Sequence, residues 1–178
     1  LITGIACSYF DSIPNIHITG QVNLNEQRGS MPGTSGSRQI GFQETDIVSI
    51  SKPVTKRSIQ LKKADEIYYV LDDLYNRANS GRKGPVLLDL PMCLQRQSVI
   101  SKKNIKSKYK PEKSKIINIV NIYKLIKDSK RPVILTGGGV RYSNSIKEFN
   151  SLIKHLKVPV VSSWSGVDTI DSSNRFYY

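Results

Sequence analysis

Residues 85–90 restrict the possible folds of this chain more than any other segment. The run Pro-Val-Leu-Leu-Asp-Leu is almost continuously apolar, as expected of a strand in a parallel sheet that is covered on both faces. The preceding residues 65–79 have the apolar spacing of an amphipathic helix, and Gly81 is its expected C-terminal stop. The residues predicted on its buried face are Ile67, Val70, Leu71, Leu74, Tyr75 and Ala78.

The same alternation of strands and helices recurs along the chain. Residues 15–19 are β-branched and bounded by Pro14 and Gly20, which predicts a buried strand. In the second half, we expect a helix from about residue 114 to 128, a strand at 132–136, a helix at 145–155 and a strand at 158–162. Right-handed crossovers would make these strands parallel. The predicted fold class is therefore α/β, built of parallel-sheet βαβ layers.

Two polar stretches interrupt this pattern. Residues 23–38 are rich in Gly, Ser, Asn and Gln and predict a loop. Residues 92–113 are rich in Lys, Ser, Gln and Asn, which is typical of an interdomain linker. The predicted organisation is a domain at 1–91, a linker at 92–113 and a second domain at 114–178. A chain of 178 residues with 38% hydrophobic content is long enough for one domain or two partial ones.

The net charge of +13 ordinarily raises the question of a nucleic-acid partner. Much of the excess lies at residues 102–115, without a recognisable nucleic-acid-binding motif, so we interpret it as a solvated linker and expect no nucleic-acid partner. Apolar runs stay below the ~20 residues that span a bilayer, and we expect no membrane partner. Cys7 and Cys93 lack metal-ligand spacing. They fit a reduced, cytoplasmic setting without a metal site, with Cys7 as a small buried apolar residue.

The triplet Gly137-Gly138-Gly139 stands between a predicted strand and a predicted helix. Bare backbone amides and a helix N-terminus at such a turn can approach a phosphate closely. A tight strand-to-helix turn also requires glycine for its own geometry. From spacing alone, both interpretations stay open.

Several motifs occur in a fixed order over nearly the whole chain. They are residues 19–22 (Thr-Gly-Gln-Val), 41–46 (Gly-Phe-Gln-Glu-Thr-Asp), 52–56 (Lys-Pro-Val-Thr-Lys), 80–91 (Ser-Gly-Arg-Lys-Gly-Pro-Val-Leu-Leu-Asp-Leu-Pro) and 131–139 (Arg-Pro-Val-Ile-Leu-Thr-Gly-Gly-Gly). Together they resemble the thiamine-diphosphate enzymes, most closely the acetolactate synthase large-subunit group. The resemblance implies an internal fragment: part of a pyrimidine-binding domain followed by part of a central Rossmann-like domain.

The resemblance also implies an activity. Such enzymes are carboligases or decarboxylases of 2-keto acids, and acetolactate synthases join two pyruvates into acetolactate with loss of CO2. Thiamine diphosphate and Mg²⁺ are the expected cofactors, and the intact enzyme is expected to be a homodimer or homotetramer. The activating glutamate lies upstream of this chain in the family and the Mg²⁺ motif downstream, so we expect the isolated fragment to be inactive. The alternatives are a related lyase with another acceptor, a non-catalytic family member and a basic nucleotide-binding module.

Two groups of site residues follow from the resemblance. Phe42 and Gln43 match residues on the substrate side of the thiazolium ring, where Phe42 would shape an apolar pocket and Gln43 would bind a keto-acid carboxylate or carbonyl. The alternative is a strand-end pair that caps the next helix. The second group surrounds a bound FAD in the family and comprises Arg82, Gly137, Gly138, Gly139, Ser163, Trp164 and Ser165.

One departure from the family pattern follows residues 87–91. The family has Lys-Asp at this point, with the lysine near the active-site channel, whereas this chain has Met92 and Cys93. A neutral thioether cannot neutralise a keto-acid carboxylate. This difference favours another acceptor or second substrate, unless Arg28 or Arg38 of the loop at residues 23–38 supplies the positive charge of the lysine.

Overall fold

The computed structural model describes residues 1–100, 109–110 and 117–178. The chain divides into two units, Leu1–Glu112 and Lys113–Tyr178, and each is described by itself. Most of the basic stretch at 102–115, interpreted above as a solvated linker, lies outside the described residues, as does the expected helix start at residue 114.

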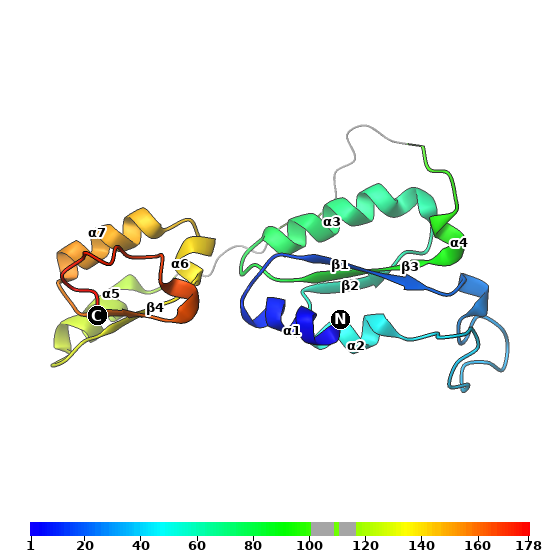
Figure 1. Ribbon diagram of the computed structural model, residues 1–178, viewed down its shortest axis with the longest axis horizontal. Coiled ribbons are helices and arrows are strands. Elements are labelled where there is room, and N and C mark those ends of the chain that lie inside the picture. Colours follow the sequence, from blue (N-terminus) through cyan, green and yellow to red (C-terminus); the bar gives the residue numbers. More distant parts are fainter. Residues whose placement is uncertain (101–108, 111–116) are drawn as a thin grey trace. The chain divides into compact units, whose positions relative to one another are not determined.

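The first unit is built on a three-stranded parallel sheet with the strand order β1-β3-β2. Its strands are β1 (Ile16–Gln21), β2 (Arg57–Gln60) and β3 (Val86–Pro91), and Ile16 and Arg57 both lie opposite Val86. Figure 1 shows helix α3 over one face of this sheet and α1 and α2 over the other. The central strand β3 is accordingly buried, with Val86, Leu87 and Leu88 fully inaccessible to solvent. The predicted parallel α/β arrangement is confirmed.

Helix α3 (Ile67–Asn79) follows a short 3-10 turn, Ala64–Glu66. Val70, Leu74 and Ala78 are buried and belong to the same core as Val86 and Leu88 of β3. The predicted burial of Tyr75 is wrong, because this side chain lies one position beyond Leu74 at the edge of the buried face and is 61% exposed. The helix ends at Asn79 with Ser80 as its C-cap, and Gly81 follows with a positive φ of 53°, as expected of a C-terminal stop.

Two sequence-based assignments in the first unit need correction. Helix α1 (Ile2–Phe10) buries Ile5 and Ser8, which lie one turn apart, so Cys7 faces away and is exposed rather than buried. The predicted linker begins too early, since Met92–Gln95 form helix α4 directly after β3. Leu94 of α4 joins the hydrophobic core because the chain turns back onto the sheet at this point.

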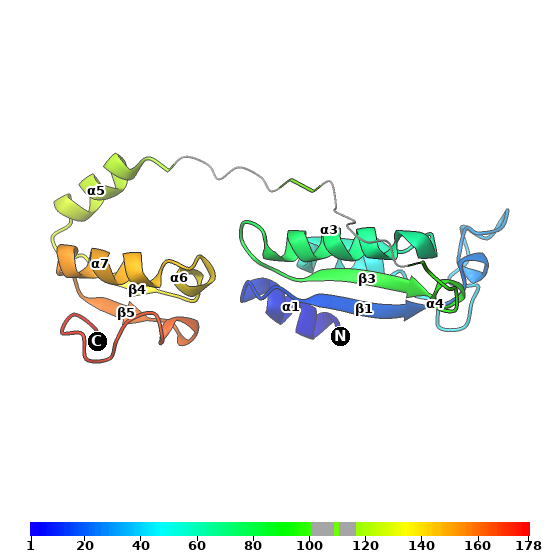
Figure 2. The same cartoon turned by 90° about the horizontal axis from the view of Figure 1, so that it is seen from above.

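The second unit contains two parallel strands, β4 (Ile134–Thr136) and β5 (Val160–Ser162). Helices α6 (Gly139–Tyr142) and α7 (Ile146–Leu156) lie between them in sequence, and the 3-10 turn η4 (Trp164–Gly166) follows β5. Figure 2 shows this unit with α6 and α7 beside the two strands. Its core is formed by Ile153, Val160 and Ile170, against which Ile134 and Phe149 pack.

Helix α5 (Ile119–Asp128) begins later than the expected residue 114. Residues 117 and 118 are not helical, and the Asn118 side chain caps the helix by accepting a hydrogen bond from the Asn121 amide at 3.2 Å. Most of the apolar side chains of this helix are exposed, among them Ile119, Val120 and Tyr123.

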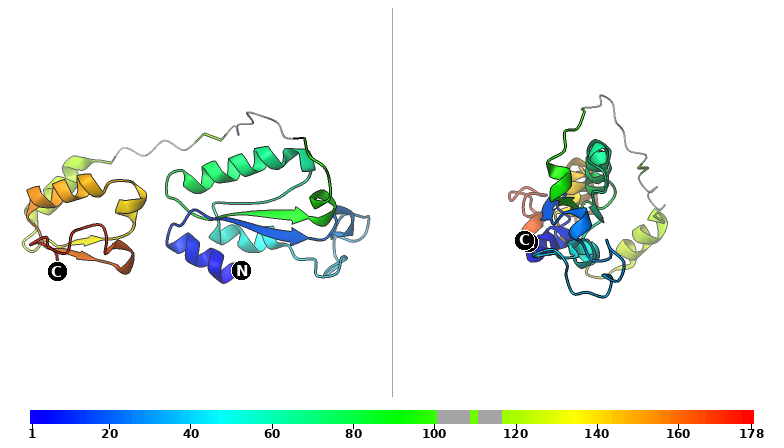
Figure 3. Two further views of the ribbon diagram at one scale, coloured as in Figure 1. Left: turned by 45° about the horizontal axis from the view of Figure 1, so that its top comes forward. Right: turned by 90° about the vertical axis from the view of Figure 1, so that its right-hand side faces the viewer.

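The C-terminal segment lies alongside β5 (Figure 3). The Val160 amide donates to the Phe176 carbonyl at 2.7 Å, and the Tyr178 amide donates to the Val160 carbonyl at 3.0 Å. Within the described parts of both units, no helix is both long enough and apolar enough to cross a membrane.

Candidate functional site

The carboxyl ends of β1, β2 and β3 meet at one edge of the parallel sheet, where open α/β sheets commonly bind ligands. A pocket of about 500 Å³ lies there. Its walls combine strand-end side chains with residues of two surface loops. The lining residues are Gln21, Gln27, Arg28, Glu44, Thr45, Asp46, Val48, Ser58, Ile59, Gln60, Lys62 and Asp89.

Asp89 of the central strand supplies a buried carboxylate to this pocket, with 1% of the residue exposed. Its Oδ1 accepts from the Thr19 hydroxyl at 2.7 Å, and its Oδ2 accepts from the Gln60 amide at 2.8 Å and the Gln21 amide at 3.3 Å. Hydrogen bonds from three side chains offset the cost of burying this polar group. Sequence reasoning missed Asp89, although a lone acidic residue within an apolar strand run was a visible signal.

The loop at residues 41–46 closes one side of the pocket. Gly41 is required by close packing, because an added Cβ would lie 2.9 Å from both the Glu26 carbonyl oxygen and Val22 Cγ2. The Glu44 carboxylate accepts the backbone amides of Arg28 at 2.6 Å and Ile40 at 2.7 Å, and these bonds lower the pKa of Glu44. The loop is therefore fixed to the polar loop that precedes it.

Asp46 ends this loop and begins helix α2 (Ile47–Ser51) as its N-cap. Its side chain accepts from the Ser49 amide at 3.0 Å, and hydrogen bonding with Ser49 lowers the pKa of Asp46. The interpretation of Phe42 and Gln43 as the cap of this helix is thus wrong, since Asp46 performs that function.

Phe42 and Gln43 directly precede the pocket residues Glu44 and Thr45 in the loop. Phe42 is 82% exposed, and Gln43 is exposed with a positive φ of 62°. An exposed phenylalanine on a fixed loop is available to a ligand rather than committed to the core. The assignment of both residues to substrate stays a prediction.

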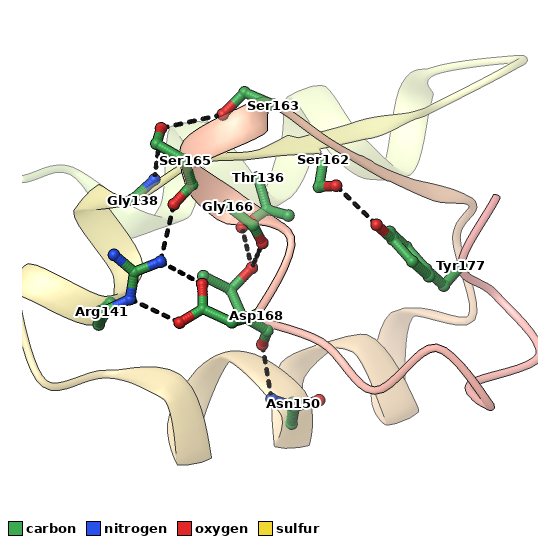
Figure 4. Close-up of polar contacts among 11 residues, drawn as sticks. Thr136, Gly138, Arg141, Asn150, Ser162, Ser163, Ser165, Gly166, Asp168 and Tyr177 are labelled. Atoms are coloured by element: carbon green, nitrogen blue, oxygen red, sulfur yellow. Dashed lines mark hydrogen bonds and ion pairs between the residues drawn. The ribbon is translucent and has the colours of Figure 1, made fainter. Parts of the chain in front are cut away.

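In the second unit, the glycine turn lies against the segment that follows β5 (Figure 4). The Gly138 amide donates to the Ser165 hydroxyl at 3.4 Å. A Cβ at Gly138 would approach the Ser165 carbonyl oxygen to 3.0 Å, whereas a Cβ at Gly139 would have open space within 4 Å. Close packing explains Gly138, whereas a Cβ at Gly137 would make an ordinary contact with Ser163 Oγ at 3.4 Å and Gly139 presents the most open backbone of the three.

The expected helix N-terminus next to the glycine turn needs correction. The helix that starts at Gly139 is α6, which has four residues, and the long helix α7 starts only at Ile146. A single turn has a small dipole, so a ligand at this turn would be held by individual backbone groups and side chains rather than by a helix dipole.

Hydrogen bonds fix the segment after β5 in place, as Figure 4 shows. Arg141 of α6 forms an ion pair with Asp168 and donates to the Ser165 carbonyl at 2.9 Å. The Thr169 hydroxyl pairs with Thr136 at 2.9 Å and donates to the Gly166 carbonyl at 2.6 Å. These contacts bring residues 163–165 next to the glycine turn. Trp164 in this segment is 96% exposed.

Arg82 belongs to the first unit. Its Nε donates to the Ser12 hydroxyl at 2.8 Å, and its guanidinium also donates to the Phe10 carbonyl at 3.4 Å. Arg82 lines a second pocket, of about 610 Å³, that is rich in cationic side chains. The other lining residues are Lys56, Arg77, Ser80, Gly81, Tyr109 and Lys110.

Comparison with known proteins identifies the family. Residues 119–178 match the model of the thiamine pyrophosphate enzyme central domain. The acetolactate synthase large subunit of Lactococcus lactis subsp. lactis (strain IL1403) is 32% identical over 98% of this chain and 29% of its own length. The chain belongs to the thiamine-diphosphate enzyme family.

Two further relatives of this thiamine-diphosphate enzyme are also named as acetolactate synthase large subunits. The probable acetolactate synthase large subunit of Methanocaldococcus jannaschii is 38% identical over 93% of the chain and 28% of its own length. The acetolactate synthase large subunit of Buchnera aphidicola subsp. Acyrthosiphon pisum is 34% identical over 97% of the chain and 30% of its own length. The chain thus spans less than a third of the length of these curated relatives.

Proposed function

We propose that this chain is part of a thiamine-diphosphate-dependent enzyme that joins 2-keto acids, as acetolactate synthases join two pyruvates into acetolactate with loss of CO2. The observation that carries the proposal is the similarity to acetolactate synthase large subunits along 98% of the chain. The fixed loop at residues 41–46, beside the sheet-edge pocket, supports it.

Within this proposal, thiamine diphosphate supplies the electron sink for the carbanion that forms when the carboxylate leaves. Phe42 covers the apolar side of the 2-keto acid, and the Gln43 amide donates to its carboxylate or carbonyl. We assign no Mg²⁺ ligand to residues 1–178 and place that site, with the activating glutamate, elsewhere in the complete protein. The complete protein is proposed to be a cytoplasmic homodimer or homotetramer, without nucleic-acid or membrane partners.

A different acceptor remains the second candidate, because Met92 replaces the family lysine. Met92 is 39% exposed, and an Arg96 guanidinium nitrogen lies 3.4 Å from its Sδ. Arg96 is therefore a candidate, beside Arg28 and Arg38, for the positive charge that the lysine supplies in the family. If one of these arginines places its charge in the active-site channel, pyruvate stays the preferred acceptor.

The test of the proposed function uses the product of the complete reading frame. Phe42→Ala should lower kcat/KM for pyruvate about tenfold, which corresponds to about 1.4 kcal/mol of lost contact. The melting temperature should stay unchanged because Phe42 is 82% exposed. Phe10→Ala, which removes another exposed phenylalanine, is the matched control and should leave turnover unchanged. Equal activity of the two variants would count against the substrate role of Phe42.

We also propose that the glycine turn contacts the diphosphate of FAD through Gly139. The turn has room for such a group at Gly139, where an added Cβ would meet no atom within 4 Å, whereas at Gly138 an added Cβ would meet Ser165. Gly139→Ala should keep the stability of the protein, since alanine suits the first position of α6. Its methyl group would nevertheless obstruct the close backbone approach that a diphosphate needs, so the variant should purify without the visible flavin absorbance of the wild type.

Arg82→Ala provides a separate test of the flavin proposal. Loss of one charge-assisted contact should weaken FAD binding by about 1.5–3 kcal/mol, measured by titration of the apoprotein with FAD. A wild type that stays colourless after addition of FAD, or a Gly139→Ala variant that retains flavin fully, would contradict the proposed site.

A further inference from the structure

Gln21, the last residue of β1, links the buried carboxylate of the sheet to the loop at residues 41–46. Its Oε1 accepts from the Val22 amide at 3.0 Å. Its Nε2 donates to the Thr45 carbonyl at 2.6 Å and to Asp89 Oδ2 at 3.3 Å. A carbonyl oxygen and a carboxylate can only accept, so these partners assign the orientation of the side-chain amide.

The two ends of this link differ in rigidity. Asp89 lies in the central strand, is 1% exposed and is also bound by Thr19 and Gln60. Thr45 lies in a surface loop and is exposed. Gln21 therefore transmits the fixed position of the sheet to the backbone of a loop that otherwise faces solvent.

The loop needs such support because of its backbone geometry. Gln43 adopts a left-handed conformation, with a φ of 62°. For a residue other than glycine, this conformation persists only where the surroundings hold it. Thr45 stands two residues after Gln43. The hydrogen bond from Gln21 to the Thr45 carbonyl therefore restrains the backbone next to this left-handed residue.

We propose that Gln21 is a positioning residue that holds Phe42 and Gln43 in their 2-keto-acid-binding geometry through the Thr45 carbonyl. This inference rests on the proposed function for the identity of the ligand. The positioning of the loop itself depends only on the contacts of Gln21, and it can be measured without turnover.

Gln60 offers a matched control on the neighbouring strand. Its amide donates to the same Asp89 oxygen at 2.8 Å, while its own oxygen accepts from Lys62 at 2.6 Å. Gln21→Leu and Gln60→Leu thus each remove one donor from Asp89, but only Gln21→Leu also releases Thr45. Gln21→Met, which is unbranched and close to glutamine in length, serves as a second variant should Gln21→Leu fold poorly.

The first measurement is amide hydrogen exchange of residues 40–47 in the product of the complete reading frame. In the wild type, the Ile40, Glu44 and Ile47 amides are hydrogen-bonded within the loop. We expect their exchange to be at least tenfold faster in Gln21→Leu or Gln21→Met, and unchanged in Gln60→Leu. Equal exchange in all the variants would overturn the inference.

The second measurement separates positioning from general destabilisation. The KM for pyruvate should rise about tenfold in Gln21→Leu with a smaller change in kcat. Thr19→Val, which also removes one donor from Asp89 but changes no residue that lines the pocket, should keep the wild-type KM at a similar loss of thermal stability. The same rise of KM in both variants would show a structural effect and overturn the inference. A wild type that does not consume pyruvate would overturn the proposed function, and hydrogen exchange would then decide the positioning of the loop alone.

Discussion

Replacing Asp89 with alanine should lower the free energy of unfolding by about 3–5 kcal/mol, because the Thr19 hydroxyl and the Gln60 amide lose their buried acceptor and the Gln21 amide loses one of two partners. Each buried donor left without a partner costs about 1–3 kcal/mol. Urea-induced unfolding followed by circular dichroism measures the change.

Asp65→Ala is the control for the Asp89 variant, since Asp65 is exposed on the same unit. Its effect should stay within about 0.5 kcal/mol, as is usual for surface substitutions. If Asp89→Ala were no less stable than Asp65→Ala, the buried carboxylate would not be the organising group of the sheet edge.

Gly166→Ala should be the most damaging small substitution in the second unit. The added Cβ would lie 2.7 Å from the Thr136 carbonyl oxygen and 2.8 Å from Gly137 Cα, and both are backbone atoms that no rotamer change can move away. Overpacking of this kind costs about 1–3 kcal/mol, and we expect the upper end of this range.

The readout for Gly166→Ala is the thermal melting of the protein. Gly36→Ala is the control, because the Cβ of residue 36 would meet no atom within 4 Å. A Gly166→Ala protein that melted at the same temperature as Gly36→Ala would contradict the close contact between η4 and the end of β4.

The sequence predicted elements whose burial follows a strong pattern. The continuous apolar run of β3 and the spacing of Val70, Leu74 and Ala78 in α3 led directly to a buried parallel strand and its covering helix. The predictions were wrong where the pattern was weak. Tyr75 lies at the edge of the buried helix face and is exposed, and residues 92–95, whose composition resembles a linker, form helix α4.

The network around Asp89 could not be predicted in the same way. It depends on strand register, which places Thr19 and Gln60 opposite Asp89 on the two neighbouring strands. Residues 70 and 29 positions apart become neighbours only when the sheet forms. Spacing along the sequence carries no information about such pairs.

The glycine triplet shows a similar limit. The sequence marks three equivalent glycines, whereas the structure separates them by what a side chain would meet: Ser163 Oγ at 3.4 Å for Gly137, the Ser165 carbonyl oxygen at 3.0 Å for Gly138, and open space for Gly139. Close packing therefore explains Gly138 but not Gly139, for which contact with a ligand stays a prediction.

The most direct test of the proposed function is product analysis of the complete protein with ¹³C-labelled pyruvate as the sole substrate. With thiamine diphosphate and Mg²⁺ present, the proposal predicts acetolactate and CO2 in equal amounts, and neither product when thiamine diphosphate is omitted. Release of CO2 without acetolactate, with a carboligation product only after another aldehyde or 2-keto acid is added, would contradict the synthase assignment. Absence of any turnover that depends on thiamine diphosphate would contradict the proposed function as a whole.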